Sequence, residues 1–191
     1  MFNDRTSLLS FLSTRRSCRP RDLVDPGPSA DELKQIITIA SRSPDHGKLH
    51  PWLFVHVPRS ARADFAALLQ RAYLKNNPSP GRLEVEANEK FAHQAPELIV
   101  VLSTPREAKI PDWEQQLSCG AACLNLLMAA SALDYCAGWV TGWAAYSEEV
   151  SKAFGGRIAG FVFIGSRGAP LEERDRPAFE EIFSEWPDVT G

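Results

Sequence analysis

The sequence predicts one α+β domain built around a central sheet. Three apolar runs predict strands, at residues 52–57, 98–103 and 158–165. The middle run is apolar without interruption, as expected of a strand covered on both faces. Segments with helical periodicity separate these runs. Helices and strands do not alternate strictly, which favours the α+β class over a doubly wound sheet. The chain of 191 residues is long enough for one sizeable core and too short for two.

A first helix is predicted over residues 3–14, with Asn3 or Asp4 as its amino-terminal cap. Its apolar stripe consists of three leucines: Leu8, Leu9 and Leu12. The helix ends in a segment rich in arginine: Arg15, Arg16 and Arg19. Guanidinium groups bind phosphate oxygens two bonds at a time, and the hydroxyl of Ser17 adds a donor, so this segment is a candidate phosphate clamp. The alternative is a solvated basic helix end that complements the helix dipole.

A second helix is predicted from the capping box of Ser29 and Glu32 to about Arg42, where Pro44 ends it. The loop that follows, up to Pro51, carries basic and imidazole side chains: Arg42, His46, Lys48 and His50. A loop held between two rigid elements is a good place to bind a charged planar ligand. The alternative is a solvated connection whose prolines only set the turn. We favour no metal site, because the prolines exclude a helical face and no third ligand has suitable spacing.

Further helices are predicted at 60–75, 83–93 and 111–133. The longest is apolar nearly all round from Cys119 onwards, which predicts burial on every side. A domain of this size rarely encloses a helix completely, so we expect a partner subunit to cover one face. Cys119 and Cys123 lie one turn apart in this helix, and we expect small buried hydrophobes rather than a metal or redox pair.

Beyond the long helix, residues 135–145 combine aromatic and small side chains, and Gly138 and Gly142 allow the backbone to approach a ligand or another chain. Ser147 is predicted to cap a short helix that ends at a glycine pair. The last segment, 166–191, carries large apolar side chains with helical spacing: Phe179, Ile182, Phe183 and Trp186. These side chains are too apolar for a free tail, so we expect them to be packed.

The composition argues against several classes of function. The formal net charge is −3, which gives no electrostatic basis for binding nucleic acid or an anionic membrane. Gly-x-Gly-x-x-Gly, Walker and Gly-x-Ser-x-Gly motifs do not occur. The start of the chain lacks the apolar run of a signal peptide, and no window is long and apolar enough to span a membrane. We therefore expect a cytoplasmic protein.

Short motifs occur in order along nearly the whole chain. In the first half they are Arg15-Arg-Ser17, Arg42-Ser-Pro-Asp-His46 and His50-Pro-Trp-x-Phe54. In the second half they are Pro111-x-Trp113-Glu-Gln, Trp139-Val-Thr-Gly142 and Gly160-Phe-x-x-x-Gly165. Each motif alone has low specificity, but the ordered set resembles the flavin-dependent nitroreductase family, in particular its short bacterial NAD(P)H nitroreductases.

The resemblance implies a three-layer α/β/α domain over residues 1–191 with a central mixed sheet. It also implies an intertwined homodimer, in which the segment from about 168 to 191 packs on the partner. Each of two interface clefts would hold FMN. Electrons would pass from NADH or NADPH to a nitroaromatic, quinone or similar small acceptor in a ping-pong cycle. Because the flavin carries this chemistry, no catalytic side chain is expected, and no metal, nucleic acid or membrane partner is implied.

By position, the resemblance implies three groups of cofactor-binding residues. Arg15 and Ser17, with Arg16 beside them, would hold the phosphate and the ribityl chain. Arg42 and His46 would join the site from the central loop. The isoalloxazine would be lined, from the other subunit, by Trp139, Val140, Thr141 and Gly142. A segment associated with the nicotinamide nucleotide matches Ala129, Ala130, Ser131, Ala132, Leu133 and Asp134.

One position departs from the family pattern. Val140 stands where close relatives often carry arginine, which removes a charge near the cofactor. Thr141 or a nearby backbone N–H is expected to donate to the reactive nitrogen of the flavin. Arg167, Arg174 and Arg176 are candidates for a supporting role. The sequence leaves open an enone or halogenated aromatic as acceptor, a flavin-binding sensor without turnover, and a dimeric interaction module whose arginines are surface charge.

Overall fold

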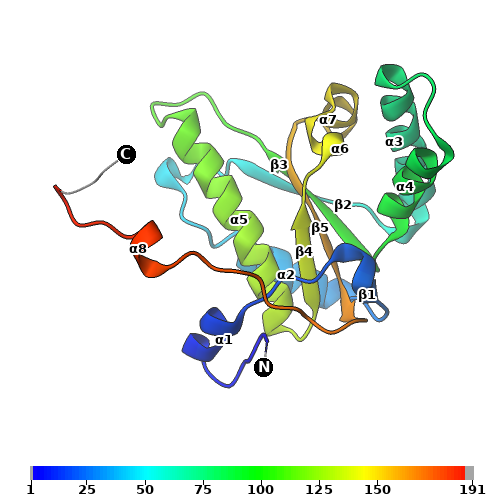
Figure 1. The fold of residues 1–191 in the computed structure, drawn as a ribbon. Helices are drawn as coiled ribbons and strands as arrows, with labels where there is room; N and C mark the ends of the chain where they lie inside the picture. The colour runs from blue at the N-terminus through cyan, green and yellow to red at the C-terminus, as the bar shows by residue number, and fades with distance from the viewer. Residues whose placement is uncertain (1, 188–191) are drawn as a thin grey trace.

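Helices cover both faces of a five-stranded sheet (Figure 1). The structure, a computed structural model, describes residues 2–187. Its strands are β1 (Leu23–Val24), β2 (Trp52–His56), β3 (Glu97–Ser103), β4 (Cys136–Val140) and β5 (Arg157–Arg167). Their order is β1-β5-β3-β2, with β4 paired to β5, and every pairing is antiparallel. The strand directions differ from the mixed sheet that we expected, because no described segment supplies a parallel neighbour.

Side chains of β3 alternate between two cores, one on each face of the sheet. Leu98, Val100 and Leu102 belong to the first core, and Ile99 and Val101 belong to the second. The first core is covered by α3 (Arg62–Asn76), α4 (Arg82–His93), α6 (Trp143–Tyr146) and α7 (Glu148–Phe154). The second core is covered by α2 (Ala30–Ala40) and α5 (Asp112–Ala132). This arrangement confirms the α+β class and the three layers.

The caps of two helices follow the sequence prediction. The hydroxyl of Ser29 accepts from the backbone N–H of Glu32 (3.3 Å), and the Glu32 carboxylate accepts from the N–H of Ser29 (2.8 Å). The capping box is therefore confirmed, although α2 ends at Ala40, slightly earlier than predicted. Ser147 caps α7, which ends at Gly155 in the left-handed conformation, with φ of 80°.

Helix α1 (Leu8–Thr14) begins later than predicted. Ser7 is its cap, because the Ser7 hydroxyl accepts from the backbone N–H of Ser10 (3.0 Å), so the assignment of this role to Asn3 or Asp4 is wrong. Phe11 is the buried residue of the helix. The predicted apolar stripe is exposed to solvent: Leu8, Leu9 and Leu12.

Helix α5 is buried on one face only. Cys119 and Cys123 are buried free thiols on that face, as predicted. The opposite face exposes large apolar side chains: Trp113, Leu117 and Leu124. The prediction of burial on every side is therefore wrong for a single chain, because the described chain supplies nothing to cover this face.

After β5 the chain crosses α5 and carries α8 (Phe179–Ile182) on the other side of that helix (Figure 1). Its large apolar side chains are between 50% and 88% exposed: Phe179, Ile182, Phe183 and Trp186. Phe179 and Phe183 stack on each other with ring centroids 4.7 Å apart, but none of the four side chains belongs to either core of the described chain. The last residues of the predicted segment, 188–191, lie outside the described part of the chain.

Cys18 and Cys136 form a disulfide across a sequence separation of 118 residues, with their Cα atoms 5.8 Å apart. The sequence did not predict this pair, because spacing carries no information about two cysteines so far apart. The bond joins the segment after α1 to the start of β4.

Within residues 2–187, no helix has the combination of length and hydropathy that crossing a bilayer requires.

Candidate functional site

The first group of predicted residues lies in the arginine turn, a name used here for Arg15–Cys18. This turn runs along β4, where the backbone N–H of Cys18 donates to the carbonyl oxygen of Ala137 (3.0 Å). A Cβ atom at Gly138 would collide with the carbonyl oxygen of Cys18, so the close approach of the turn to β4 requires glycine. The turn is therefore held beside the strand that carries the third predicted group.

Arg15 is partly buried and forms no ion pair within the described part of the chain. Its Nη1 donates to the hydroxyl of Ser17 (3.2 Å). Burial, followed by the positive charges of Arg176, Arg16 and Arg174, lowers the pKa of Arg15. A guanidinium group in these surroundings lacks a counter-charge, which an anion with several acceptor oxygens would supply.

The segment after β5 folds over the arginine turn. The Nε of Arg16 donates to the carbonyl oxygen of Glu172 (2.8 Å), and the guanidinium of Arg19 pairs with the Glu172 carboxylate (2.6 Å). Glu173 pairs with Arg176 (3.2 Å) and, more weakly, with Arg16 (3.8 Å). These contacts place late basic residues beside the turn, which sequence alone suggested but did not locate.

The three arginines predicted to support the site, Arg167, Arg174 and Arg176, differ in their position relative to Arg15. Arg174 and Arg176 lie close enough to Arg15 for their charges to act on it. Arg167, at the end of β5, instead lines a small cavity of about 30 Å³ next to Arg16. The positive charge around Arg15 therefore comes from both ends of the chain.

The second predicted group lies on the central loop beside α5. His46 Nδ1 is 2.8 Å from the Glu114 carboxylate, and the hydroxyl of Ser118 donates to the carbonyl oxygen of Pro44. The Asp45 carboxylate accepts from two backbone N–H groups of the loop, at 3.1 and 2.9 Å. Asp45 therefore orders the loop, and the Arg42 side chain is exposed to solvent.

The third predicted group ends β4 and starts α6. The indole Nε1–H of Trp139 donates to the carbonyl oxygen of Ala159 (3.2 Å), which holds the indole over β5. Val140 is partly buried against the first core. Gly142 has φ of 75°, a conformation that favours glycine, and it begins the turn into α6. Trp139 and Thr141 line a cavity of about 270 Å³.

Two of the three groups lie together in one chain, which favours one subunit as the source of both the arginine turn and Trp139–Gly142, unlike the two subunits that the resemblance implied. The arginine turn and Trp139–Gly142 both adjoin β4, whereas the central loop is anchored to the amino-terminal half of α5. Figure 1 shows the segment between α1 and β1 and the loop between α2 and β2 at different places on the molecule. No hydrogen bond or ion pair among residues 2–187 joins the arginine turn to Arg42 or His46.

The segment predicted for the nicotinamide nucleotide lies at the end of α5, and half of it is buried. Ala129, Ala130 and Ser131 are buried, with exposed fractions of 2%, 0% and 6%. The packing of α5 on the sheet closes off Ala129 and Ala130, whereas Ser131 and Asp134 line a cavity of about 630 Å³. Asp134 is exposed and pairs with Arg5 (2.7 Å). Its predicted contact with the nicotinamide nucleotide stays a prediction.

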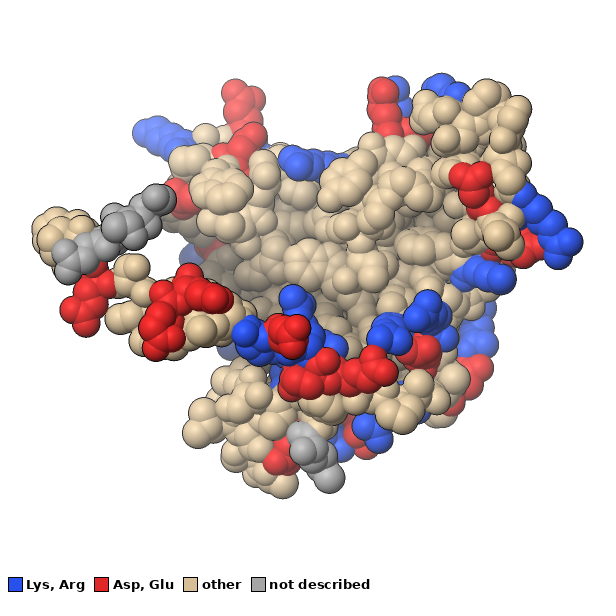
Figure 2. All heavy atoms as spheres, in the orientation of Figure 1, with Lys and Arg blue, Asp and Glu red and all other residues tan. Residues whose placement is uncertain are grey.

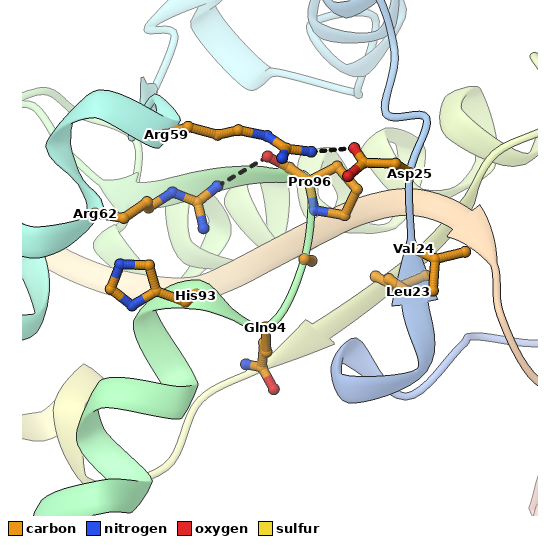
Figure 3. A pocket seen from close by; sticks show the side chains of 9 residues that line it. Leu23, Val24, Asp25, Arg59, Arg62, His93, Gln94 and Pro96 are labelled. Atoms are coloured by element: carbon orange, nitrogen blue, oxygen red, sulfur yellow. Dashed lines mark hydrogen bonds and ion pairs between the residues drawn. The ribbon is translucent and has the colours of Figure 1, made fainter.

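A separate cavity of about 230 Å³ lies between β1, the start of α3 and the end of α4 (Figure 3). Arg62 is 2% exposed and donates to the carbonyl oxygens of Val57 (2.8 Å), Ala92 (2.8 Å) and Pro96 (3.3 Å). Arg59 pairs with Asp25. Both guanidinium groups that line this cavity are thus bound within the fold. Their bonds join the start of α3 to α4 and to the segments that follow β1 and β2 and precede β3, which indicates a structural role.

Figure 2 shows a hollow lined by uncharged side chains, and along its lower edge Lys and Arg side chains lie among Asp and Glu side chains. A phosphate fits the donors of the arginine turn, and an apolar planar group fits the wall beside Trp139. A three-layer α+β fold with such a hollow agrees with the class that the sequence motifs resemble, the nitroreductase-like proteins.

The comparisons with known proteins agree with this class. The model of the nitroreductase family matches residues 12–166. A protein of Haemophilus influenzae named "Putative NAD(P)H nitroreductase" is 35% identical over 173 residues, covering 87% of this chain and 91% of the relative. The chain therefore belongs to the nitroreductase family, a family of oxidoreductases.

Two crystal structures show the same fold. The nitroreductase-like protein of Bacillus cereus has a TM-score of 0.79 and 20% identity, covering 97% of this chain and 98% of the other. The nitroreductase of Bacteroides fragilis, solved with bound FMN, has a TM-score of 0.70 and 22% identity, covering 93% and 98%.

Proposed function

We propose that the protein is an FMN-dependent oxidoreductase that passes electrons from NADH or NADPH to a nitroaromatic, quinone or similar small acceptor in a ping-pong cycle. The observation that carries the proposal is the environment of Arg15. Its guanidinium group is partly buried, lies near three other arginines and has no ion-pair partner in the described chain. Family membership and the FMN bound by a structural neighbour support the phosphate of FMN as the anion that Arg15 would bind.

The residues present suit FMN. The arginine turn offers two guanidinium groups and the Ser17 hydroxyl, a donor set suited to a phosphate dianion. When bound, the flavin supplies the hydride chemistry. The chain itself would bind the phosphate, orient the ring beside Trp139 and exclude water. Gly142, with its positive φ, begins the turn into α6, and Thr141 or a nearby backbone N–H would donate to the reactive nitrogen of the flavin.

We further propose that the cofactor site is completed by a second copy of the chain. The central loop and the arginine turn are separate within one chain, so Arg42 and His46 would reach the flavin from the partner. The exposed faces of α1 and α5 and the apolar tail give such a dimer a large hydrophobic interface. In this dimer the segment from about 168 to 191 would pack on the partner.

The absorbance spectrum of protein purified without added cofactor tests this function first. A yellow protein that releases FMN on denaturation is expected. Oxidation of NADPH or NADH that depends on a nitroaromatic or quinone then separates an enzyme from a flavin-binding sensor, the second candidate. A colourless protein that neither binds added FMN nor dimerises would contradict the proposal.

Arg15→Ala tests the phosphate role. Losing a charge-assisted bond of about 1.5–3 kcal/mol should weaken FMN binding roughly ten- to hundredfold. Arg19→Ala is the matched control, because Arg19 lies in the same segment but pairs with Glu172. Equal FMN affinity in the Arg15→Ala variant and the parent would show that the phosphate lies elsewhere.

A further inference from the structure

The cavity beside Trp139 and Thr141 has a volume of about 270 Å³. It lies between the amino-terminal half of α5, the ends of β3 and β4, the start of β5, and α6. Small-ligand pockets generally have volumes of about 300–1,000 Å³, so this cavity suits a ligand the size of one aromatic ring. The wall formed by Trp139, Ile158 and Ala159 is apolar and favours such a ring.

Gly120 leaves open space on the α5 wall of this cavity. It lies in the middle of α5, where glycine costs about 0.5–1 kcal/mol relative to alanine. A Cβ atom there would meet no described heavy atom within 4 Å, so packing within the chain does not require glycine. Gly120 lines the cavity, and a side chain at this position would project into it.

The polar groups of the cavity favour an anion. Arg157 pairs in register with Ser103 across β3 and β5, and its exposed guanidinium forms no ion pair or hydrogen bond within residues 2–187. The buried hydroxyl of Ser103 has no hydrogen-bond partner either. Gln116 adds a side-chain amide, and the residues that line the cavity include no aspartate or glutamate. One positive charge without an opposing carboxylate attracts a negatively charged ligand.

We propose that this cavity, the acceptor pocket, binds the electron-accepting substrate, and that Arg157 makes it favour a single aromatic ring that carries a carboxylate. This inference rests on the proposed function, because Trp139 and Thr141 place the pocket beside the expected flavin ring. Arg157 would bind the carboxylate in a bidentate manner, and the ring would lie against the apolar wall.

For a nitroaromatic acceptor, the nicotinamide donor supplies the two electrons that the reduction needs. The donor gives one hydride, and water supplies one further proton. One N–O bond of the nitro group breaks, and its oxygen leaves as water, so the nitro group is reduced to a nitroso group while the nicotinamide is oxidised. The carboxylate is unchanged and serves only recognition.

The role of the Arg157 charge is tested with two acceptors of the same shape, 4-nitrobenzoate, which is negatively charged, and 4-nitrobenzamide, which is neutral. We expect the holoprotein to have a KM about tenfold lower for the benzoate. In Arg157→Gln the ratio of the two KM values should approach one, and Arg157→Lys should keep part of the difference. Arg71→Gln, at an exposed arginine of α3, is the matched control. An unchanged ratio in Arg157→Gln would overturn the assignment of Arg157.

Calorimetric titration with 4-nitrobenzoate, without a nicotinamide donor, gives a readout that does not depend on turnover. Binding that is about tenfold weaker in Arg157→Gln supports the proposal, and equal binding contradicts it. Failure of the proposed function has a different appearance, because the protein would then hold no FMN or reduce neither acceptor. If the protein holds FMN but reduces neither acceptor, titration of the holoprotein still reports on the pocket, and if it holds no FMN, the protein as purified is titrated instead.

Gly120→Leu tests the space itself. Its side chain should weaken binding of both acceptors at least tenfold while FMN content and the elution volume of the dimer stay unchanged. Undiminished binding of both acceptors would show that they bind elsewhere. Dissociation of the dimer would show that the partner chain occupies the space, which would also overturn the proposal.

Discussion

The side chain of Asn3 holds the backbone of Arg16 at two points. Its Nδ2 donates to the carbonyl oxygen of Arg16 (3.2 Å), and its Oδ1 accepts from the N–H of Arg16 (2.7 Å). The backbone N–H of Asn3 also donates to the carbonyl oxygen of Thr14 (3.0 Å). Asn3 has φ of 53°, a left-handed conformation that asparagine tolerates better than most residues. The amino-terminal segment therefore fixes the arginine turn.

Asn3→Ala should weaken FMN binding about tenfold, because two hydrogen bonds of about 0.5–1.5 kcal/mol each keep the turn in place. FMN titration by fluorescence measures the change. Asn77→Ala is the matched control, since the Asn77 amide bonds only to the carbonyl of Tyr73 at the end of its own helix (3.2 Å). If Asn3→Ala binds FMN as well as the parent, the turn is held by its other contacts alone.

Gly160→Ala should displace the indole of Trp139, because a Cβ at this position would overlap the Nε1 edge of the ring. The bond from Nε1 to Ala159 would break, and we expect a loss of stability of about 1–3 kcal/mol. Tryptophan emission and acceptor binding should both change. Gly156→Ala is the control, because its Cβ would meet neighbours at ordinary distances of 3.6–3.8 Å. Unaltered emission would count against the role of Gly160.

Arg62→Met should lower the free energy of unfolding by about 3 kcal/mol, since three buried carbonyl groups would lose their donor. For a chain of this length, the melting temperature should fall by roughly 6–12 °C. Arg59→Met should have a small effect, because its ion pair with Asp25 is exposed. FMN affinity of the folded protein should be preserved, and its loss would connect this region to the cofactor.

The capping box predicts a dependence on pH. Hydrogen bonds from the Ser29 hydroxyl and N–H, and then from Tyr135, lower the pKa of Glu32. A carboxyl group whose pKa is lower in the folded state stabilises the fold above its unfolded pKa of about 4.3. This contribution is lost as the pH falls below that value.

Glu32→Gln should therefore flatten the acid side of a plot of melting temperature against pH, and the variant and parent should converge at low pH. Thermal melts between about pH 2 and pH 7 measure this. Glu107→Gln, at an exposed glutamate in the loop before α5, should leave the curve unchanged. Parallel curves for Glu32→Gln and the parent would exclude a role for the ionised cap.

Local patterns allowed most helices and the strands β2, β3 and β5 to be predicted from the sequence, but β1 and β4 were not predicted. The box at Ser29 and Glu32, the unbroken apolar run of β3 and the cap at Ser147 each depend on neighbours within a few residues. Such interactions repeat with the period of the element, so spacing alone reveals them. The cap of α1 was misplaced because Asn3, Asp4 and Ser7 are all good caps, and tertiary bonds of Asn3 decide between them.

Long-range contacts could not be predicted in this way. The disulfide of Cys18 and Cys136, and the approach of Arg174 and Arg176 to Arg15, join residues more than a hundred positions apart. The site residues were found because the motifs resembled a family, and their roles stay predictions. The acceptor pocket was missed because Ser103, Gln116 and Arg157 share no motif and meet only in the folded chain.

The separation of the arginine turn from Arg42 and His46 within one chain has a consequence for how the protein is handled. If a second copy completes each site, dimerisation and flavin retention are linked equilibria, and each must strengthen the other by the same factor. Dilution should then bleach the protein, and added FMN should restore both colour and dimer. Stock concentration, ordinarily a detail of preparation, would determine how much of the sample is holoprotein.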